Sequence, residues 1–276
     1  MTSVPSPGPS TSPKTGGAFE LTRSEGRAAL VGYLPAGFPD VPGAIEALRT
    51  MVDCGCDVIE VGLPYSDPVM DGPTIQAAAQ RALEGGIRTS DVIRTVEAVA
   101  ATGTPTVVMT YWNPVARYGV ERFAADLASA GGAGLITPDL TPDSAEEWIA
   151  AADGHDLDKV FLVAPSSTDE RLRYTADACR GFIYATAVMG VTGARASTSD
   201  LAGPLVERTR AVTDLPVGVG LGVSNGDQAA EVASYADGVI VGSAFVRVLL
   251  DADDKTSGLR ALSALTEDLA SGVRRG

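Results

Sequence analysis

Short runs of continuous apolar residues alternate along this chain with segments that carry a helical pattern. A strand covered on both faces, as in a parallel sheet, is apolar throughout instead of alternating with polar residues. From about residue 28 onward the pattern therefore predicts eight parallel strands. They lie within residues 28–37, 58–64, 106–114, 134–140, 159–165, 181–190, 215–223 and 237–246.

The segments between these runs are rich in alanine and carry the start and stop residues of helices. Many open on Ser, Thr, Asp or Asn, which cap helix N-termini, and many close on Gly. A final helical pattern covers residues 257–273. Eight strand–helix units in a chain of 276 residues favour a single (β/α)8 TIM barrel of the α/β class over an open doubly wound sheet, which usually has fewer strands.

The first residues of the chain differ in composition from the rest. Residues 1–18 are mostly Pro, Ser, Thr and Gly, so we expect a disordered tail followed by one barrel domain at residues 19–276. The tail lacks the apolar core of a signal peptide, and no run elsewhere reaches the ~18 apolar residues of a membrane span. We therefore expect a soluble protein that is not exported and works in the cytoplasm.

Composition narrows the possible functions. A formal net charge of −14 argues against nucleic acid or an anionic membrane as a partner, because those ligands need clustered Lys and Arg. The three cysteines, Cys54, Cys56 and Cys179, suit neither a local disulfide nor the usual zinc spacing, so we expect reduced thiols and no metal site. The single histidine, His155, lies in a sequence typical of a surface turn, which disfavours histidine-dependent mechanisms.

Two carboxylates around the second apolar run are the strongest chemical signal. Glu60 lies within the run, where burying an ionisable group is costly unless the group has a use. Asp71 follows in a loop punctuated by Pro and Gly. Acid–base chemistry needs two carboxyls in different surroundings, one desolvated and one solvated. Glu60 could equally pair with a buried Arg or Lys, and the pattern alone does not decide between these interpretations.

Barrel enzymes carry their chemistry at the carboxyl ends of the strands. By this rule four further residues can converge on the same pocket as the two carboxylates. They are Tyr111, Asn113, Asp139 and Tyr184.

Glycine-bearing turns follow the last three predicted strands, at residues 191–194, 220–222 and 242–244. Backbone N–H groups at such turns bind anions, so the three together favour a phosphorylated ligand, although each alone is equally explained as an ordinary turn. The sequence contains neither a Walker-type loop nor a strand-linked GxGxxG motif, so a nucleotide or NAD site is unsupported.

The segment from Glu60 to Thr74 resembles, almost letter for letter, a signature of the tryptophan synthase α chain family. The resemblance runs from about Phe19 to the C-terminus. Further motifs follow in the family's order, at residues 33–39, 109–114, 190–195, 220–223 and 241–244. The resemblance implies a TIM-barrel lyase that cleaves indole-3-glycerol phosphate to indole and glyceraldehyde 3-phosphate in the last stage of L-tryptophan biosynthesis.

The family resemblance also implies a role for each candidate residue. Glu60 would be first the acid toward indole C3 and then the base toward the glycerol hydroxyl, and Asp71 would bind the indole N–H. Thr192 would lie on a mobile loop that closes toward Asp71. The phosphate would be held by Gly193, Gly222, Gly242 and Ser243. The expected substrate-binding set is Tyr33, Tyr111, Tyr184, Thr192, Gly193, Gly222, Gly242 and Ser243.

Three positions depart from the family pattern in ways expected to change the pocket wall. Leu221 stands where many members have an aromatic residue, and Tyr33 and Phe182 are aromatic variants. None of the three removes a charged group.

The resemblance implies no cofactor in this chain and a partner, a pyridoxal-phosphate-dependent β chain, in an α2β2 heterotetramer. Two alternatives remain open at this point. The chain could be a stand-alone lyase that releases free indole, or a catalytically idle barrel kept as an activating subunit. Intact Glu60 and Asp71 argue against the second alternative.

Overall fold

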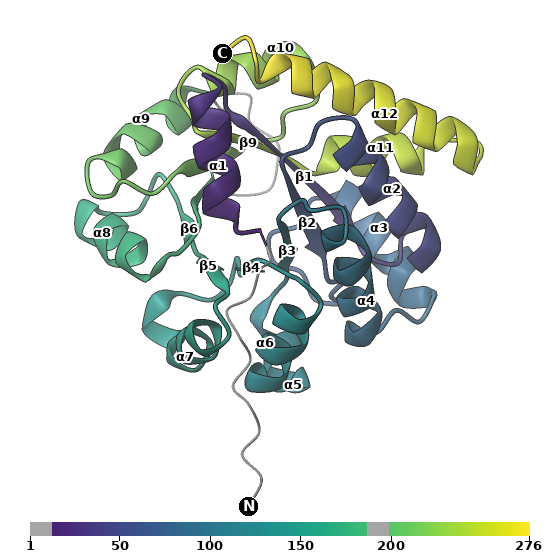
Figure 1. Cartoon of the computed structure of the whole chain (residues 1–276), viewed down its shortest axis with the longest axis horizontal. Helices are drawn as coiled ribbons and strands as arrows, with labels where there is room; N and C mark the ends of the chain where they lie inside the picture. The colour runs from purple at the N-terminus through teal and green to yellow at the C-terminus, as the bar shows by residue number, and fades with distance from the viewer. Residues whose placement is uncertain (1–12, 187–198) are drawn as a thin grey trace, which may run out of the picture.

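The computed structural model describes residues 13–186 and 199–276, which form a barrel of parallel strands enclosed by helices (Figure 1). The strands are β1 (Ala29–Pro35), β2 (Val58–Gly62), β3 (Thr106–Met109), β4 (Gly134–Ile136), β5 (Asp158–Val160), β6 (Leu162–Val163), β7 (Ile183–Thr186), β8 (Val217–Gly220) and β9 (Gly238–Val241). The helices up to β5 are α1 (Thr15–Ser24), α2 (Val41–Asp53), α3 (Pro73–Glu84), α4 (Thr89–Ala100), α5 (Trp112–Tyr118), α6 (Val120–Ser129), the 3-10 helix η1 (Pro142–Ser144) and α7 (Glu146–Gly154). The helices after β6 are α8 (Asp169–Ala178), α9 (Ser199–Arg210), α10 (Gly226–Ala233), α11 (Ser243–Leu250) and α12 (Lys255–Gly272).

The described strands form one sheet in the order β5-β4-β3-β2-β1-β9-β8-β7-β6. Its two end strands, β5 and β6, are consecutive in the chain and separated only by Phe161, so the sheet closes on itself. The sequence predicted one strand at 159–165 where the structure has two. Among the described strands, Asp158–Val160 pairs with β4 and Leu162–Val163 pairs with β7, because the chain moves from one neighbouring strand to the other at Phe161. The described residues therefore contain nine strands instead of the predicted eight.

Strand alternation decides which side chains enter the barrel. Ile59 and Val61 belong to the large apolar cluster between the strands and the helices, whereas Val58 belongs to the smaller cluster inside the barrel. Because successive side chains of a strand point to opposite faces, Glu60 points inward on the same face as Val58. The run 58–62 is buried at every position, which is why it reads as continuously apolar apart from Glu60.

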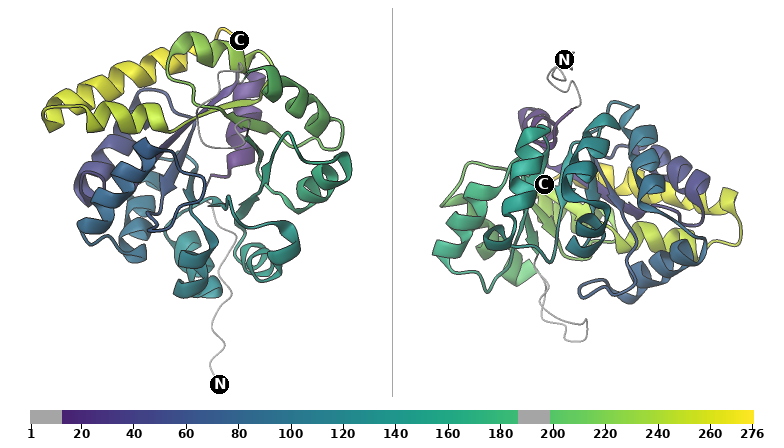
Figure 2. Two further views of the ribbon diagram at one scale, coloured as in Figure 1. Left: turned by 180° about the vertical axis from the view of Figure 1, so that it is seen from behind. Right: turned by 90° about the horizontal axis from the view of Figure 1, so that it is seen from below.

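Helix α1 lies across the amino end of the barrel (Figure 2). Its Phe19 ring stacks on Phe182 with the ring centroids 5.0 Å apart, and the backbone N–H and Oγ1 of Thr15 donate to Asp158 Oδ2 at 2.9 and 2.7 Å. Residues 15–18, which composition predicted to be disordered, are therefore helical. Contacts with the amino end of the barrel hold this turn, and such contacts cannot be inferred from composition. Phe182 packs at the same amino end and does not line the pocket, contrary to expectation.

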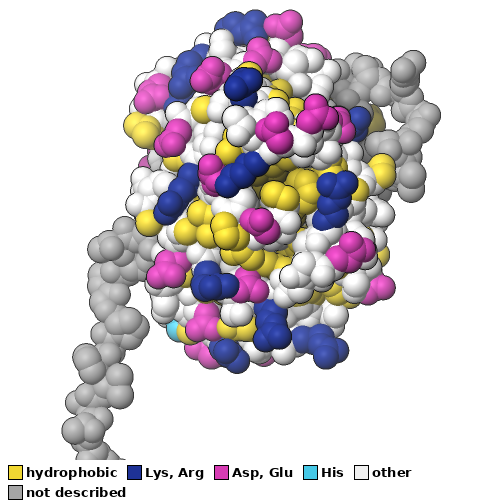
Figure 3. Space-filling model, turned by 90° about the vertical axis from the view of Figure 1, so that its right-hand side faces the viewer, with side chains coloured by type: hydrophobic (Ala, Val, Ile, Leu, Met, Phe, Trp, Pro, Cys, Tyr) yellow, Lys and Arg dark blue, Asp and Glu magenta, His cyan; other side chains and the backbone are white. Residues whose placement is uncertain are grey.

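The outer surface carries charges of both signs. Figure 3 shows Lys and Arg mixed with Asp and Glu over one side of the barrel, around a group of hydrophobic side chains. Within residues 13–186 and 199–276, no helix combines the length and the apolar character needed to cross a bilayer.

The cysteines and the histidine lie outside the candidate chemistry. None of the three cysteines forms a disulfide. His155 contacts Glu121 through Nε2 at 2.7 Å and takes no part in the pocket.

Candidate active site

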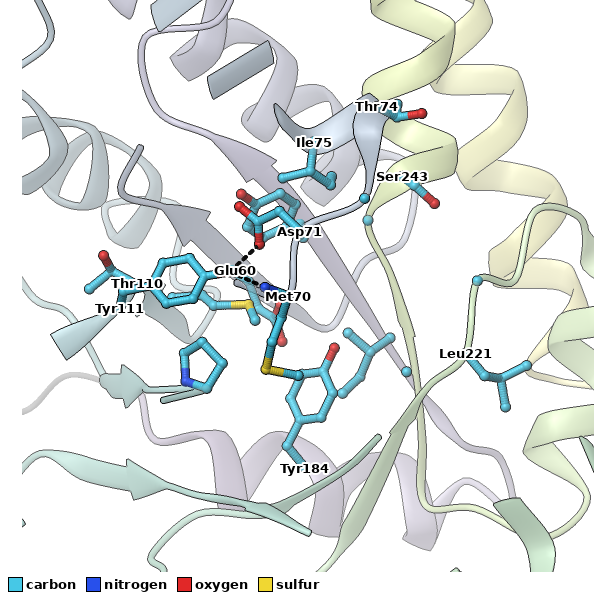
Figure 4. A pocket seen from close by; sticks show the side chains of 18 of the residues that line it. Glu60, Met70, Asp71, Thr74, Ile75, Thr110, Tyr111, Tyr184, Leu221 and Ser243 are labelled. Atoms are coloured by element: carbon cyan, nitrogen blue, oxygen red, sulfur yellow. Dashed lines mark hydrogen bonds between the residues drawn. The ribbon is translucent and has the colours of Figure 1, made fainter. Parts of the chain in front are cut away.

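A cavity of about 370 Å³ opens at the carboxyl ends of the strands (Figure 4). It brings together the two predicted catalytic carboxylates and every predicted substrate-binding residue that lies in the described part of the chain. These residues are Tyr33, Glu60, Asp71, Tyr111, Tyr184, Gly222, Gly242 and Ser243. Thr192 and Gly193, which the sequence also singled out, lie outside the described residues.

Glu60 is the most unusual residue in the cavity. Its side chain lines the cavity although the residue is only 1% exposed, and neither carboxyl oxygen has a hydrogen-bond partner among the described residues. No described Arg or Lys pairs with it, so the structure contradicts the interpretation of Glu60 as half of a buried ion pair. Burial raises the pKa of the Glu60 carboxyl to about 8, because the ionised form loses its hydration without gaining a partner. Glu60 is therefore mostly protonated at neutral pH.

The raised pKa predicts a pH dependence of folding stability. The unfolded carboxyl ionises near its ordinary pKa of 4.5 while the folded one keeps its proton up to about pH 8. Between these values the unfolded chain binds fewer protons, so stability falls as pH rises, by at most about 5 kcal/mol at ~1.4 kcal/mol per pKa unit. We expect Glu60→Gln to remove this component. Urea unfolding of both proteins at about pH 5 and about pH 8 measures it, and parallel pH profiles would contradict the assignment.

Asp71 occupies a more polar environment in the loop between β2 and α3. Its Oδ1 accepts a hydrogen bond from Tyr111 Oη at 2.9 Å, and the same phenol oxygen accepts one from the Met70 N–H at 3.0 Å (Figure 4). Partial burial raises the pKa of Asp71, and the hydrogen bond from Tyr111 opposes this rise. The cavity therefore holds two carboxyls in different surroundings, as the sequence predicted.

Two tyrosines form the walls beside Glu60. Tyr33 of β1 is in register with Glu60 of β2, and its ring lies over Gly62, where a Cβ would come within 2.3 Å of the phenol oxygen. Tyr184 of β7 lies over Gly220 in the same way, where a Cβ would come within 2.5 Å. These glycines leave the space that the two rings occupy. Burial raises the pKa of both phenols, so they remain neutral hydrogen-bond donors.

The end of the cavity formed by Gly222, Gly242 and Ser243 is suited to an anion. Gly242 is the N-cap of α11 and Ser243 its first residue, so unpaired backbone N–H groups and the positive end of the helix dipole face the cavity. Gly222, after β8, has a positive φ of 82°, and nothing lies within 4 Å of the position a Cβ would take. The open space beside Gly222 favours a bound group over a role in packing alone.

Some expectations about the pocket were wrong, and some of its residues were missed. Asp139 accepts the Trp112 N–H at 2.9 Å and Asn113 donates to Tyr65 Oη at 3.2 Å, so both stabilise loops outside the cavity. Leu221 lines the cavity as expected, with Gly220 of the predicted turn beside it. The missed lining residues are Leu63, Met70, Gly72, Pro73, Thr74, Ile75, Met109, Thr110, Pro138, Ile240 and Arg247. Most are apolar and carry no chemical signal in the sequence. In the described segments no group of three His, Cys, Asp or Glu residues is placed to hold a metal ion.

Comparison with known proteins gives one consistent answer. A family model described as tryptophan synthase alpha chain matches residues 19–274. The tryptophan synthase alpha chain of Salinispora arenicola is 64% identical over 259 residues, which cover 94% of this chain and 97% of that protein. That of Nocardia farcinica is 62% identical over 256 residues, which cover 93% of this chain and 94% of that protein.

Solved structures agree with the sequence relatives. A structure of Mycobacterium tuberculosis tryptophan synthase matches with a TM-score of 0.89 at 58% identity, covering 96% of this chain and 100% of that one. The tryptophan synthase subunit alpha of Legionella pneumophila matches with a TM-score of 0.86 at 30% identity, covering 94% and 97%. The match over nearly the whole barrel, together with the carboxylate pair in its cavity, shows that this chain belongs to the tryptophan synthase alpha chain family.

Proposed function

We propose that this chain is a lyase that cleaves indole-3-glycerol phosphate into indole and glyceraldehyde 3-phosphate, in the last stage of L-tryptophan biosynthesis. The observation that carries the proposal is a buried, unpartnered Glu60 in one cavity with Asp71 and with the anion-binding start of α11. An aromatic ring, a reacting hydroxyl and a phosphate each find suitable surroundings in this cavity.

Glu60 can act first as an acid and then as a base. Its carboxyl proton goes to C3 of the indole ring, which gives a cation and leaves Glu60 ionised. The Glu60 carboxylate then accepts the proton of the hydroxyl on the adjacent glycerol carbon. That oxygen becomes the carbonyl of glyceraldehyde 3-phosphate, and the electron pair of the broken carbon–carbon bond returns to the ring. Glu60 ends protonated, as it began.

Asp71 serves a different purpose from Glu60. Protonation at C3 places positive charge on the ring nitrogen, and a carboxylate that accepts the indole N–H stabilises this cation through a charge-assisted hydrogen bond. The hydrogen bond from Tyr111 favours the ionised form of Asp71 and fixes its orientation. Tyr184 and Tyr33 bound the space for the ring beside Glu60.

The experiment that tests the proposed function is direct. The purified chain is incubated with indole-3-glycerol phosphate, with and without a β chain, and released indole is measured. We expect slow release by the chain alone and faster release with the β chain. Fast release that the β chain does not change would support a stand-alone lyase, and no release in a single-turnover assay would support an idle activating subunit.

We also propose that the chain works in the cytoplasm as part of an α2β2 assembly. A pyridoxal-phosphate-dependent β chain would receive indole through a tunnel, so that this apolar intermediate is not lost through membranes. In the reaction assigned to Glu60 and Asp71, proton transfers by Glu60 accompany the cleavage of the carbon–carbon bond, and this chemistry needs no cofactor in this chain. The loop after β2 is a suitable contact surface because Pro64 and Pro68 stiffen it, which lowers the cost of ordering it on docking.

Asp67→Ala tests the contact surface. Asp67 is exposed, accepts a hydrogen bond from Ser66 Oγ at 2.6 Å and does not line the cavity. We expect loss of the Asp67 carboxylate to leave indole release by the isolated chain nearly unchanged, because no catalytic contact is lost. Activation by the β chain should become weaker. Titration of β chain into both proteins measures this. Reduced basal release with normal activation would instead assign Asp67 to the catalytic pocket.

A further inference from the structure

Arg247 is the one cation among the described residues that line the cavity, where the other charged residues are Glu60 and Asp71. It lies on α11, four residues after Ser243, so it shares a helix face with the start of that helix. Side chains of an α-helix lean toward its N-terminus, which directs the long Arg247 side chain toward the anion-binding turn of Gly242 and Ser243.

The guanidinium of Arg247 is not neutralised by the protein. No carboxylate lies within ion-pair distance of it in the described parts of the chain, whereas many other arginines of this acidic protein are paired, for example Arg208 with Asp169. Its contact is a hydrogen bond from Nη2 to Thr74 Oγ1 at 3.2 Å. Thr74 belongs to the first turn of α3, three residues after Asp71.

Figure 4 shows that Thr74 and Ser243 come from neighbouring helices on the same side of the cavity. Arg247 thus reaches from the α11 side to the start of α3, across the rim of the proposed anion subsite. A planar guanidinium has several donors in a fixed fork, so it can contact a phosphate while it keeps one bond to a hydroxyl. The backbone N–H groups alone would leave a doubly charged phosphate without a cationic side chain, in a cavity that also holds the Asp71 carboxyl.

We propose that Arg247 is a substrate-binding residue that recognises the phosphate group of the substrate by direct contact. The inference rests on the proposed function for the identity of the substrate, but it assigns to the phosphate subsite a charged side chain in addition to the glycine turns. The bond to Thr74 positions the guanidinium at the rim before the anion arrives.

Binding of inorganic phosphate tests the inference independently of turnover. We expect Arg247→Met, which keeps the length of the side chain and loses the charge, to weaken phosphate binding by about 10- to 100-fold, the range for a lost charge-assisted hydrogen bond. The KM for indole-3-glycerol phosphate should rise with it, while the Kd of indole, which carries no phosphate, stays unchanged. Arg247→Lys should recover a large part of the phosphate affinity.

Two further variants separate charge recognition from a structural role. Thr74→Val removes the acceptor that positions the guanidinium but leaves the cation, so phosphate affinity should fall much less than in Arg247→Met. Arg260→Met, on the exposed face of α12, is the matched control for loss of a surface arginine. If Arg247→Met binds phosphate like the wild type, or if Thr74→Val loses as much affinity as Arg247→Met, the inference is overturned.

The two proposals can fail separately. A wild-type chain that releases no indole but binds phosphate in an Arg247-dependent way would disprove the lyase and support the anion contact. A wild-type chain that releases indole while Arg247→Met keeps normal phosphate affinity and KM would leave the lyase standing and remove Arg247 from the site.

Discussion

Glu60→Gln is expected to lower turnover of indole-3-glycerol phosphate by about 10²- to 10⁴-fold, the range attributed to general acid–base catalysis. Gln keeps the shape of the protonated side chain but has no proton that it can donate and recover. The fold should survive, because Glu60 makes no hydrogen bond or ion pair with any described residue that the substitution would break. Indole release and circular dichroism together measure the effect.

Glu97→Gln, on the exposed face of α4, is the matched control and should retain normal turnover. The wild type should also lose activity as pH rises through about 8, because Glu60 then enters the reaction without the proton that C3 requires. Turnover close to that of the wild type in Glu60→Gln would remove Glu60 from the mechanism. Turnover that does not change across this pH range would contradict its role as the acid.

Gly222→Asp is expected to weaken phosphate binding, so that inorganic phosphate competes less well with the substrate. The new carboxylate would stand beside the anion, and repulsion between unit charges about 4 Å apart costs ~1 kcal/mol in water and ~4 kcal/mol near a protein surface. This corresponds to about a 5- to 1,000-fold loss of affinity. Competition by inorganic phosphate against indole-3-glycerol phosphate measures the loss.

Gly222→Asn separates the charge from the backbone. Gly222 has a φ of 82°, which both Asn and Asp tolerate better than other residues, and both side chains have nearly the same shape. Asn should therefore reproduce the conformational cost without the repulsion and should keep much more phosphate affinity than Asp. Equal losses in the two variants would show that Gly222 serves the turn and not the anion.

The chain's local pattern was sufficient to predict much of the fold and the centre of the site. Continuous apolar runs identified the strands, because a strand buried on both faces tolerates few polar residues. That same rule made Glu60 conspicuous, and Asp71 followed from its Pro- and Gly-bounded loop. Helix starts also follow the expected residue types. The Asp40 side chain accepts the Gly43 N–H at the start of α2, and the Asn225 side chain accepts the Gln228 N–H at the start of α10.

Other features depended on residues that are distant in the sequence. The helical turn at residues 15–18 is held by Asp158, and the run at 159–165 divides because its two halves meet different neighbours when the barrel closes. Asn113 and Asp139 follow β3 and β4 in the chain, as expected, but their side chains form hydrogen bonds with loop residues outside the cavity. Arg247 and Thr74 are 173 residues apart, and Arg247 lies outside every motif that the sequence offered. Periodicity and residue type reflect the local preference of each segment for helix, strand or turn. Closure of the barrel decides which side chains share the cavity. For this reason only the tertiary structure identified Arg247 as part of the site.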